Sequence, residues 1–154
     1  MILSSHRRTD MHAMRSKSAL DSVYYLDTNI CIFHMRKPFG TLAAKINSIP
    51  HDRVKIPAVV KGELLVGAEK SNRRDDTLAE TLAFLMPFEI VPFDDSILLT
   101  YAKMRANLEL KGQKIGYNDT MIAAIVLAKN GILVTNNMRE FRRIDGLQCV
   151  DWTM

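Results

Sequence analysis

The 154-residue chain lacks the long apolar runs and the cysteine and histidine clusters that mark several large protein classes. None of its apolar runs approaches the ~20 residues that a transmembrane helix needs. Its amino terminus has basic residues but no continuous apolar segment, unlike a secretory signal. Its two cysteines, Cys31 and Cys149, have neither zinc-site spacing nor the density of a disulfide scaffold. We therefore expect a cytoplasmic protein with no membrane association, whose cysteines are small apolar side chains.

The rest of the composition is that of an ordinary globular domain, with 47% hydrophobic and 25% charged residues. The formal net charge of +4 favours a polyanionic partner. Half of this excess falls within residues 1–22, however, where four basic residues stand against two acidic ones. The charge of the body is therefore weak evidence for nucleic-acid binding.

Residues 1–22 are polar and show no apolar periodicity. Two interpretations stay open: a disordered leader, or an upstream start codon, with translation beginning at Met11 or Met14. The remaining residues, 23–154, have a length that suits one domain and contain no internal repeat. We expect them to form a single domain.

From Val23 onward, five short apolar segments alternate with stretches of helical periodicity. Short, almost continuously apolar segments predict an α/β fold of three layers, with a mostly parallel sheet of about five strands between helices. The longest helix is expected to begin at Asp94, a good N-cap, and to end at Gly112, and Asn118 is expected to cap the next one. The predicted strands are 23–26, 54–56, 89–93, 132–135 and 148–150, and the earlier predicted helices are 30–35, 41–47, 57–69 and 75–86.

Three carboxylates occupy positions that suggest a ligand site. Asp27 directly follows the first strand, and ligands of open parallel sheets gather beyond the carboxyl ends of the strands. Glu63 has apolar neighbours three and four residues away in its helix, so its charge is expected to face the packed side and to need a partner. Asp119 lies in the first turn of its helix, also beside apolar neighbours. Each also has an ordinary explanation: a helix cap, an outward-turned or paired carboxylate, and a favourable first-turn charge.

A fourth polar segment, TNNMREF at 135–141, adds Asn137 and Glu140 beyond the carboxyl end of another strand, although Asn-Asn is also a common turn signal. Together the segments bring oxygen donors to one sheet edge, and hard oxygens suit Mg²⁺ or Mn²⁺. The four histidines are scattered and give no zinc-like cluster. A divalent ion on carboxylates activates water and stabilises the charge of phosphodiester displacement, so the pattern favours a metal-dependent nuclease.

Four segments, in this order and spacing, resemble the PIN-domain nucleases, and more narrowly the VapC toxins of bacterial toxin–antitoxin modules. They are LDTN at 26–29, GELLVGAEKS at 62–71, GYNDTMIAA at 116–124 and LVTNNMREF at 133–141. The resemblance extends from about Tyr24 to Trp152. It implies a PIN fold, a divalent-metal-dependent endoribonuclease activity, inhibition by a VapB-like antitoxin, and a homodimer or larger toxin–antitoxin assembly. The chain looks most like the enterobacterial-type members that cut initiator tRNA, so tRNA is the expected substrate.

The resemblance also assigns roles to individual residues. The family's metal ligands carry over to Asp27, Glu63 and Asp119, and its polar residue in the fourth segment carries over to Asn137. Many members have Asp at this fourth position, and a neutral amide is a poorer cation ligand than a carboxylate. Occupancy of a second metal is therefore in doubt, and Glu140 is the residue that could compensate. Supporting positions are Thr28, Asn29 and Thr135.

Basic residues near the acidic segments are the candidate RNA contacts, and such phosphate contacts make binding salt-dependent. Many of them could equally be solvated surface charges. An antitoxin would need an apolar groove as well, which helices 57–69 and 75–86 could supply, although each candidate there could instead belong to the core. The RNA candidates are Arg105, Lys111, Lys114 and Arg139, with Lys103, Arg142 and Arg143 beside them, and the groove candidates are Leu64, Leu65, Leu82 and Phe84.

Two other interpretations remain. The chain could be a degenerate PIN domain that binds RNA or a protein partner without cutting, which Asn137 keeps open. It could also be a phospho-acceptor receiver domain, which gathers acids around Mg²⁺ beyond parallel strands. A receiver would show two adjacent acids near its first strand and a Lys after its last, whereas LDTN has one acid and no such Lys follows.

Overall fold

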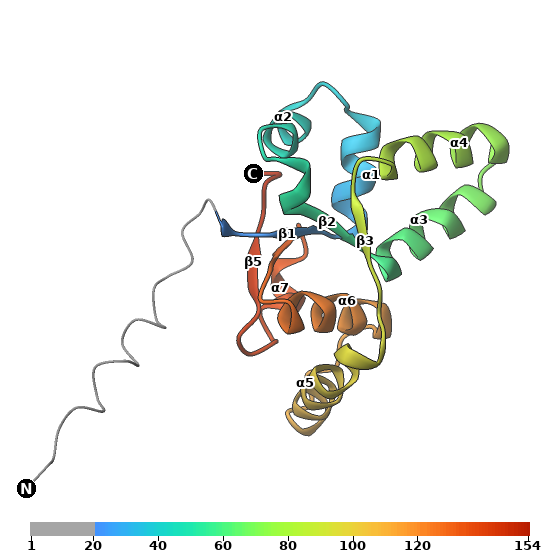
Figure 1. Ribbon diagram of the computed structural model, residues 1–154. Coiled ribbons are helices and arrows are strands. Elements are labelled where there is room, and N and C mark those ends of the chain that lie inside the picture. The colour runs from blue at the N-terminus through green and yellow to red at the C-terminus, as the bar shows by residue number, and fades with distance from the viewer. Residues whose placement is uncertain (1–20) are drawn as a thin grey trace, which may run out of the picture.

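The structure, a computed structural model, describes residues 21–154; most of the expected leader at 1–22 lies outside the described residues. Its centre is a five-stranded sheet in which every pairing is parallel, with the order β3-β2-β1-β4-β5 (Figure 1). The predicted parallel sheet of five strands is therefore confirmed. The strands are β1 (Tyr24–Leu26), β2 (Val54–Pro57), β3 (Glu89–Val91), β4 (Ile132–Val134) and β5 (Gln148–Val150).

Helices cover both faces of the sheet and make the three predicted layers. Helices α1 to α4 lie on one side, and α5, α6 and α7 lie on the other (Figure 1). Short 3-10 turns, η2 (His51–Arg53) and η3 (Asp95–Ile97), precede β2 and α5. The helices are α1 (Thr28–Arg36), α2 (Thr41–Asn47), α3 (Ala58–Glu69), α4 (Arg74–Leu85), α5 (Leu98–Leu110), α6 (Tyr117–Ala128) and α7 (Met138–Phe141).

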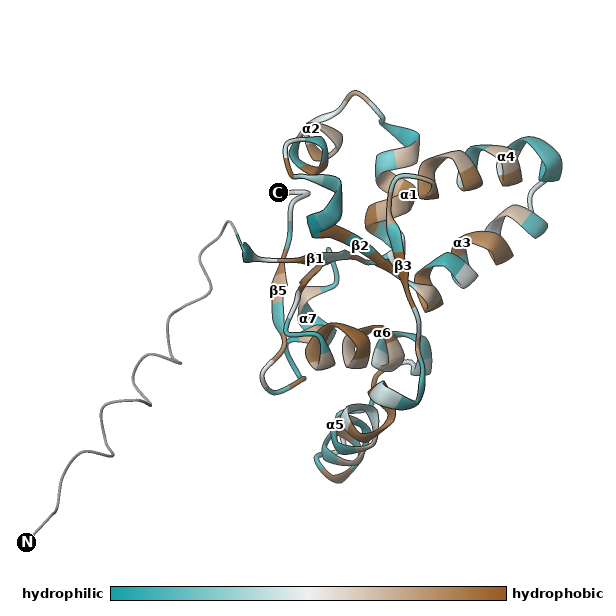
Figure 2. Cartoon of the chain, in the orientation of Figure 1, coloured by the Kyte–Doolittle hydropathy of each residue, from teal (hydrophilic) through white to brown (hydrophobic). Residues whose placement is uncertain are grey.

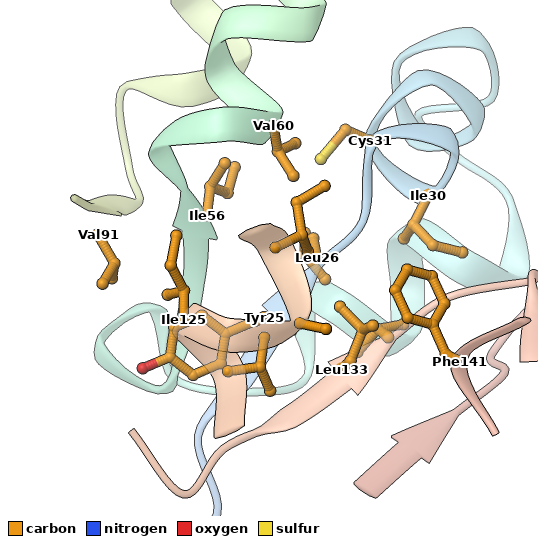
Figure 3. Packing of buried hydrophobic residues seen from close by; sticks show 14 of the residues in the cluster. Tyr25, Leu26, Ile30, Cys31, Ile56, Val60, Val91, Ile125, Leu133 and Phe141 are labelled. Atoms are coloured by element: carbon orange, nitrogen blue, oxygen red, sulfur yellow. The ribbon is translucent and has the colours of Figure 1, made fainter. Parts of the chain in front are cut away.

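The strands and α6 are apolar because they are buried on more than one side. All residues from Ile122 to Val126 on α6 have no exposed surface, as the all-round apolar pattern predicts (Figure 2). Strand side chains such as Leu26 and Leu133 pack between helix side chains that include Val60 and Phe141 (Figure 3). Cys31 lies in this core. Both Cys31 and Cys149 are free thiols, in keeping with their predicted packing role.

Two predicted helix starts have different outcomes. The carboxylate of Asp94 accepts the N–H of Ser96 at 3.0 Å, so it caps η3, which continues into α5. Gly112 follows that helix with φ 65°, a left-handed value that favours glycine. Asn118, however, is not the cap of the next helix. The N-cap is Gly116, whose carbonyl accepts both the N–H and the hydroxyl of Thr120, so α6 begins earlier than expected.

The order of the strands creates a crevice at one edge of the sheet. From β1 the chain continues to β2 on one side, while β4 pairs with β1 on the other, so the strand order reverses between β1 and β4. The N–H of Asp27 bonds to the carbonyl of Val134 at 3.0 Å, which holds these two strand ends together. Open α/β sheets bind ligands beyond the carboxyl ends of the strands at such a reversal.

Within residues 21–154, no helix has both the length and the apolar character needed to cross a membrane.

Candidate active site

Asp27 lies at the strand reversal and uses both carboxylate oxygens. Its Oδ1 accepts the N–H of Thr28 at 2.8 Å, so it is the N-cap of α1, and its Oδ2 accepts the hydroxyl of Thr135 at 2.8 Å. Only 5% of Asp27 is exposed. Burial raises the pKa of Asp27, the two hydrogen bonds lower it, and the charge of Glu63 raises it further. Asp27 is thus a helix cap and also a buried carboxylate directed by the end of β4.

Glu63 reaches the same place from α3. Its Oε2 accepts the hydroxyl of Thr28 at 2.8 Å. The prediction that Glu63 lies on the packed face of its helix is wrong. That face consists of Val60, Leu64 and Ala68, and Glu63 lies beside it. Glu63 is instead half-buried on the rim, and Val66, three residues later, is 56% exposed. The expected need for a partner was correct, and Thr28 is one.

Asp119 lies in the first turn of α6, half-buried. Burial raises its pKa, and the charges of Asp27, Glu140 and Glu63 raise it further, to about 6. These four acids come from four segments of the chain. Because the charges of the other three all act on Asp119, we call the four residues the acidic cluster.

The fourth segment is linked to the cluster through Thr135, which is fully buried. Its hydroxyl donates to Asp27 and accepts the N–H of Asn137 at 3.0 Å. The side-chain Nδ2 of Asn137 donates to Oε2 of Glu140 at 3.2 Å. Asn137 therefore holds Glu140 beside the cluster. The remaining predicted supporting residue, Asn29, is exposed and takes no part in these hydrogen bonds.

Two cavities meet next to Asp119. The first, the acidic cavity, is open, has a volume of about 690 Å³ and is lined by Glu63 and Asp119 together with Val59, Gly62, Val66, Gly116 and Asn118. The second, the Tyr117 cavity, measures about 130 Å³. Gly116 lines both. The other residues of the Tyr117 cavity are Arg105, Leu108, Glu109, Lys114, Ile115, Tyr117 and Thr120.

The cluster fits a hard divalent cation by ligand type and charge. Its donors are carboxylate, hydroxyl and amide groups, the ligands that Mg²⁺ and Mn²⁺ prefer. Burial and three neighbouring carboxylates both raise the pKa of Asp119, and a bound cation would oppose both effects. The hydroxyls of Thr135 and Thr28 donate hydrogen bonds to Asp27 and Glu63. Within residues 21–154, no three Asp, Glu, His or Cys side chains lie close enough together to ligate one ion.

The candidate RNA contacts do not lie together. Arg105 and Lys114 line the Tyr117 cavity beside the cluster. Lys111 instead pairs with Asp145 at 3.0 Å. Arg139 is exposed on α7, next to Glu140. Only the first two therefore flank the acidic cavity from the α5 side.

The groove candidates also divide. Leu64 is 4% exposed and belongs to the core, which is the alternative that the sequence left open for each groove candidate. Phe84 is partly buried and packs against the rings of His34 and Phe88. Leu82 is 45% exposed, and Leu65 is half-buried.

Tyr117 is absent from the residues predicted from the sequence. It is 65% exposed, and the guanidinium of Arg105 lies 4.6 Å from the centre of its ring. An aromatic residue two positions before Asp119, after a basic segment, is the signal that could have identified it.

Comparisons with known proteins agree with this geometry. Residues 24–147 match the family model described as the PIN domain. The chain is 34% identical over 131 residues to Ribonuclease VapC2 of Rickettsia felis, covering 84% of this chain and 98% of that protein. It is 34% identical over 130 residues to the tRNA(fMet)-specific endonuclease VapC of Shigella flexneri, with the same coverage. The structure of DNA-bound VapBC from Salmonella typhimurium superposes with a TM-score of 0.81 at 34% identity, covering 85% of this chain and 98% of that one.

Proposed function

Because the chain belongs to the PIN-domain family, among its VapC toxins, we propose that it is a divalent-metal-dependent endoribonuclease with Asp27, Glu63 and Asp119 as the metal ligands. The observation that carries the proposal is the convergence of three carboxylates: Asp27 and Glu63 both accept 2.8 Å hydrogen bonds from Thr28, and Glu63 and Asp119 line one cavity. A cluster of this kind is costly to keep without a cation. A role in binding Mg²⁺ or Mn²⁺ explains why the fold maintains it.

The chain's own residues orient the carboxylates and set their charge. Thr28 directs Glu63, Thr135 directs Asp27, and Asn137 holds Glu140 at the edge of the cluster. Asp119 must be deprotonated to serve as a ligand, so the cation and a proton compete for its carboxylate. When bound, the ion supplies a water of lowered pKa and positive charge for the phosphodiester.

The test is RNA cleavage by the purified full-length chain, free of antitoxin, in Mg²⁺ or Mn²⁺ and in EDTA. We expect cleavage with either metal and none in EDTA. Asp27→Asn and Asp119→Asn should each lower the rate on the order of 100-fold, because each removes a charged ligand. Asp52→Asn is the matched control. Asp52 is exposed and precedes β2, so it lies at the amino ends of the strands, away from the site. Its loss should leave cleavage unchanged.

Thermal unfolding gives a second readout. Millimolar Mn²⁺ should raise the melting temperature of the wild type, because a bound cation stabilises the folded state. It should raise that of Asp119→Asn much less. Cleavage that persists in EDTA, or in Asp119→Asn, would overturn the proposed ligand set.

For the substrate we infer tRNA, with initiator tRNA as the specific target. The support is similarity to the Shigella flexneri relative, whose name states this specificity, at 34% identity. The test is cleavage of transcripts of initiator and elongator methionine tRNAs under single-turnover conditions, with the 5′ ends of the products mapped. Equal cleavage of both transcripts would leave the ribonuclease assignment intact and remove the initiator specificity. Such a substrate lies in the cytoplasm, where we predict that the protein acts.

We further propose that a VapB-like antitoxin covers the surface of α3 and α4. Val66 on α3 lines the acidic cavity and is exposed, and Leu82 and Met86 are exposed on and directly after α4. An apolar segment on this surface would end beside Glu63, where a basic side chain could neutralise the cluster. Related chains crystallise as VapBC complexes. A homodimer or larger toxin–antitoxin assembly is proposed on the same similarity, and light scattering with and without the antitoxin tests it.

One observation favours the alternative of a binding module that does not cut RNA. Asn137 stands where many family members have Asp. Its Nδ2 donates to Glu140, so only its neutral amide oxygen could bind a cation. In this case the chain would bind RNA in EDTA and in Mn²⁺ alike and would not cleave it.

A further inference from the structure

Tyr117 presents an aromatic ring that contacts the guanidinium of Arg105 and is otherwise largely exposed. The guanidinium of Arg105 covers one region of the ring at 4.6 Å, while 65% of the residue remains exposed. Arg105 is itself fixed, because its Nε donates to Oε1 of Glu109 at 2.9 Å and its Nη1 donates to the hydroxyl of Tyr101 at 3.0 Å. Because Arg105 is already restrained, the Arg105–Tyr117 pair loses little conformational entropy when a planar ligand group stacks on it.

The position of the stack connects it to the acidic cluster. Tyr117 is the first residue of α6, and Asp119 lies in the same helical turn. Gly116 lines both the Tyr117 cavity and the acidic cavity. A polymer whose phosphate lies at the cluster would therefore place its neighbouring unit at the Tyr117 cavity.

The acidic cavity is lined by negative side chains, whereas the charged side chains of the Tyr117 cavity are mainly basic and lie beside an aromatic ring. The acidic cavity carries Glu63 and Asp119 and needs a cation before a phosphate can enter. The Tyr117 cavity is lined by Arg105, Lys114 and Glu109, so two positive charges stand against one negative charge, and Glu109 pairs with Arg105 at 2.9 Å. A positive charge beside an aromatic ring is the combination that binds the backbone and the bases of single-stranded nucleic acid.

We propose that Tyr117 and Arg105 form a stacking subsite for one unpaired base of the RNA, next to the phosphate that is cut, with Lys114 as the contact for the adjoining phosphate. This inference rests on the proposed ribonuclease function. It narrows the substrate class to RNA with an unpaired nucleotide beside the cleavage position, because a base in a duplex has no free face to offer. Stacking on a ring and guanidinium tolerates any base, so the subsite selects unpaired structure rather than sequence.

The test uses the full-length chain, Mn²⁺ and an oligoribonucleotide that it cuts, together with copies that carry one abasic residue at each position around the cut. Single-turnover rates against enzyme concentration give a half-saturating concentration for each RNA. For the wild type we expect one flanking position at which the abasic residue raises this value about 5- to 150-fold, the range for loss of one stacked base.

Tyr117→Leu keeps apolar bulk and removes the ring. It should raise the half-saturating concentration for intact RNA by a similar factor and abolish the dependence on that one position. Tyr117→Phe and Tyr117→Trp should retain both. The matched control is Phe39→Leu, which removes a fully exposed ring outside both cavities and should behave as the wild type.

Three results would overturn the subsite. Tyr117→Leu could bind intact RNA as the wild type does. It could instead show an equal loss at every abasic position, which would assign Tyr117 a structural role. It could also lose only antitoxin binding, which would assign the ring to a protein partner. Absence of any cleavage by the wild type would contradict the ribonuclease function instead, so the two failures are distinguishable.

Discussion

The hydroxyl of Thr28 donates a 2.8 Å hydrogen bond to Oε2 of Glu63, a residue 35 positions further along the chain. The backbone N–H of the same threonine bonds to Oδ1 of Asp27, also at 2.8 Å. One residue at the start of α1 thus orients two carboxylates of the cluster, one from the end of β1 and one from α3. Both donors are neutral groups, so neither bond brings a positive charge to the carboxylates.

Replacing Thr28 by Val removes the hydroxyl and preserves the shape of the side chain. We expect Thr28→Val to lower kcat/KM for RNA about tenfold, because supporting hydrogen bonds to metal ligands contribute at least this factor. Thr28→Ser, which retains the hydroxyl, should remain close to the wild type. The measurement is single-turnover cleavage in Mn²⁺. Equal rates for the Val and Ser variants would mean that the hydrogen bond to Glu63 has no part in the reaction.

The packing behind the site depends on Gly131, at the start of β4. A Cβ there would lie 2.3 Å from the ring of Tyr25 and 3.2 Å from the carbonyl of Val23. Because Tyr25 is buried on β1, Gly131→Ala should lower the free energy of unfolding by about 1–3 kcal/mol, the usual cost of overpacking. Gly67→Ala is the control, since a Cβ there meets nothing within 4 Å and should add roughly 0.5–1 kcal/mol. Urea unfolding measures both, and an unaffected Gly131→Ala would show that Tyr25 moves aside freely.

The sequence predicted the parts of the fold and site that depend on local pattern. Strand lengths, the buried α6 and the position of Asp27 after β1 all follow from short-range periodicity and from the rule for ligands of parallel sheets. The acidic cluster was predicted from four segments, two of which follow strands while the other two lie on helices. The three-layer α/β fold followed from the alternation of strands and helices.

What the sequence did not reveal depends on contacts between distant segments. Glu63 was expected on the packed face of its helix, but that face buries Val60, Leu64 and Ala68, and Glu63 is half-buried beside it. Leu64, the next residue, was a candidate for the antitoxin groove and lies on the buried face of the same helix. Tyr117 was missed because its significance comes from Arg105 on another helix, which no spacing rule relates to it.

Asp119 should make stability depend on pH in a defined direction. Its pKa is raised from 3.8 to about 6 in the folded state, so the folded chain binds more protons than the unfolded chain between these values. Stability contributed by this group is therefore greatest at low pH and falls as the pH rises from about 4 to about 6. Without metal, Asp119→Asn should remove this decline and raise the melting temperature at pH 8. Melting curves in EDTA across this range measure it, and an unchanged slope would show that Asp119 does not carry the repulsion.

Asn137→Asp tests whether the fourth segment can contribute a ligand to the metal site. The substitution replaces the Nδ2 donor that holds Glu140 with another carboxylate, so two like charges come together where a hydrogen bond of 3.2 Å stood. In EDTA at pH 8 we expect a lower melting temperature than that of the wild type. In Mn²⁺ the same charge becomes a ligand, so calorimetry should show affinity raised about tenfold or a second bound ion. Asn136→Asp adds the same charge at an exposed neighbouring position and should change neither quantity. If Asn137→Asp resembles this control in both measurements, the fourth segment lies too far from the cation to bind it, and three carboxylates form the whole metal site.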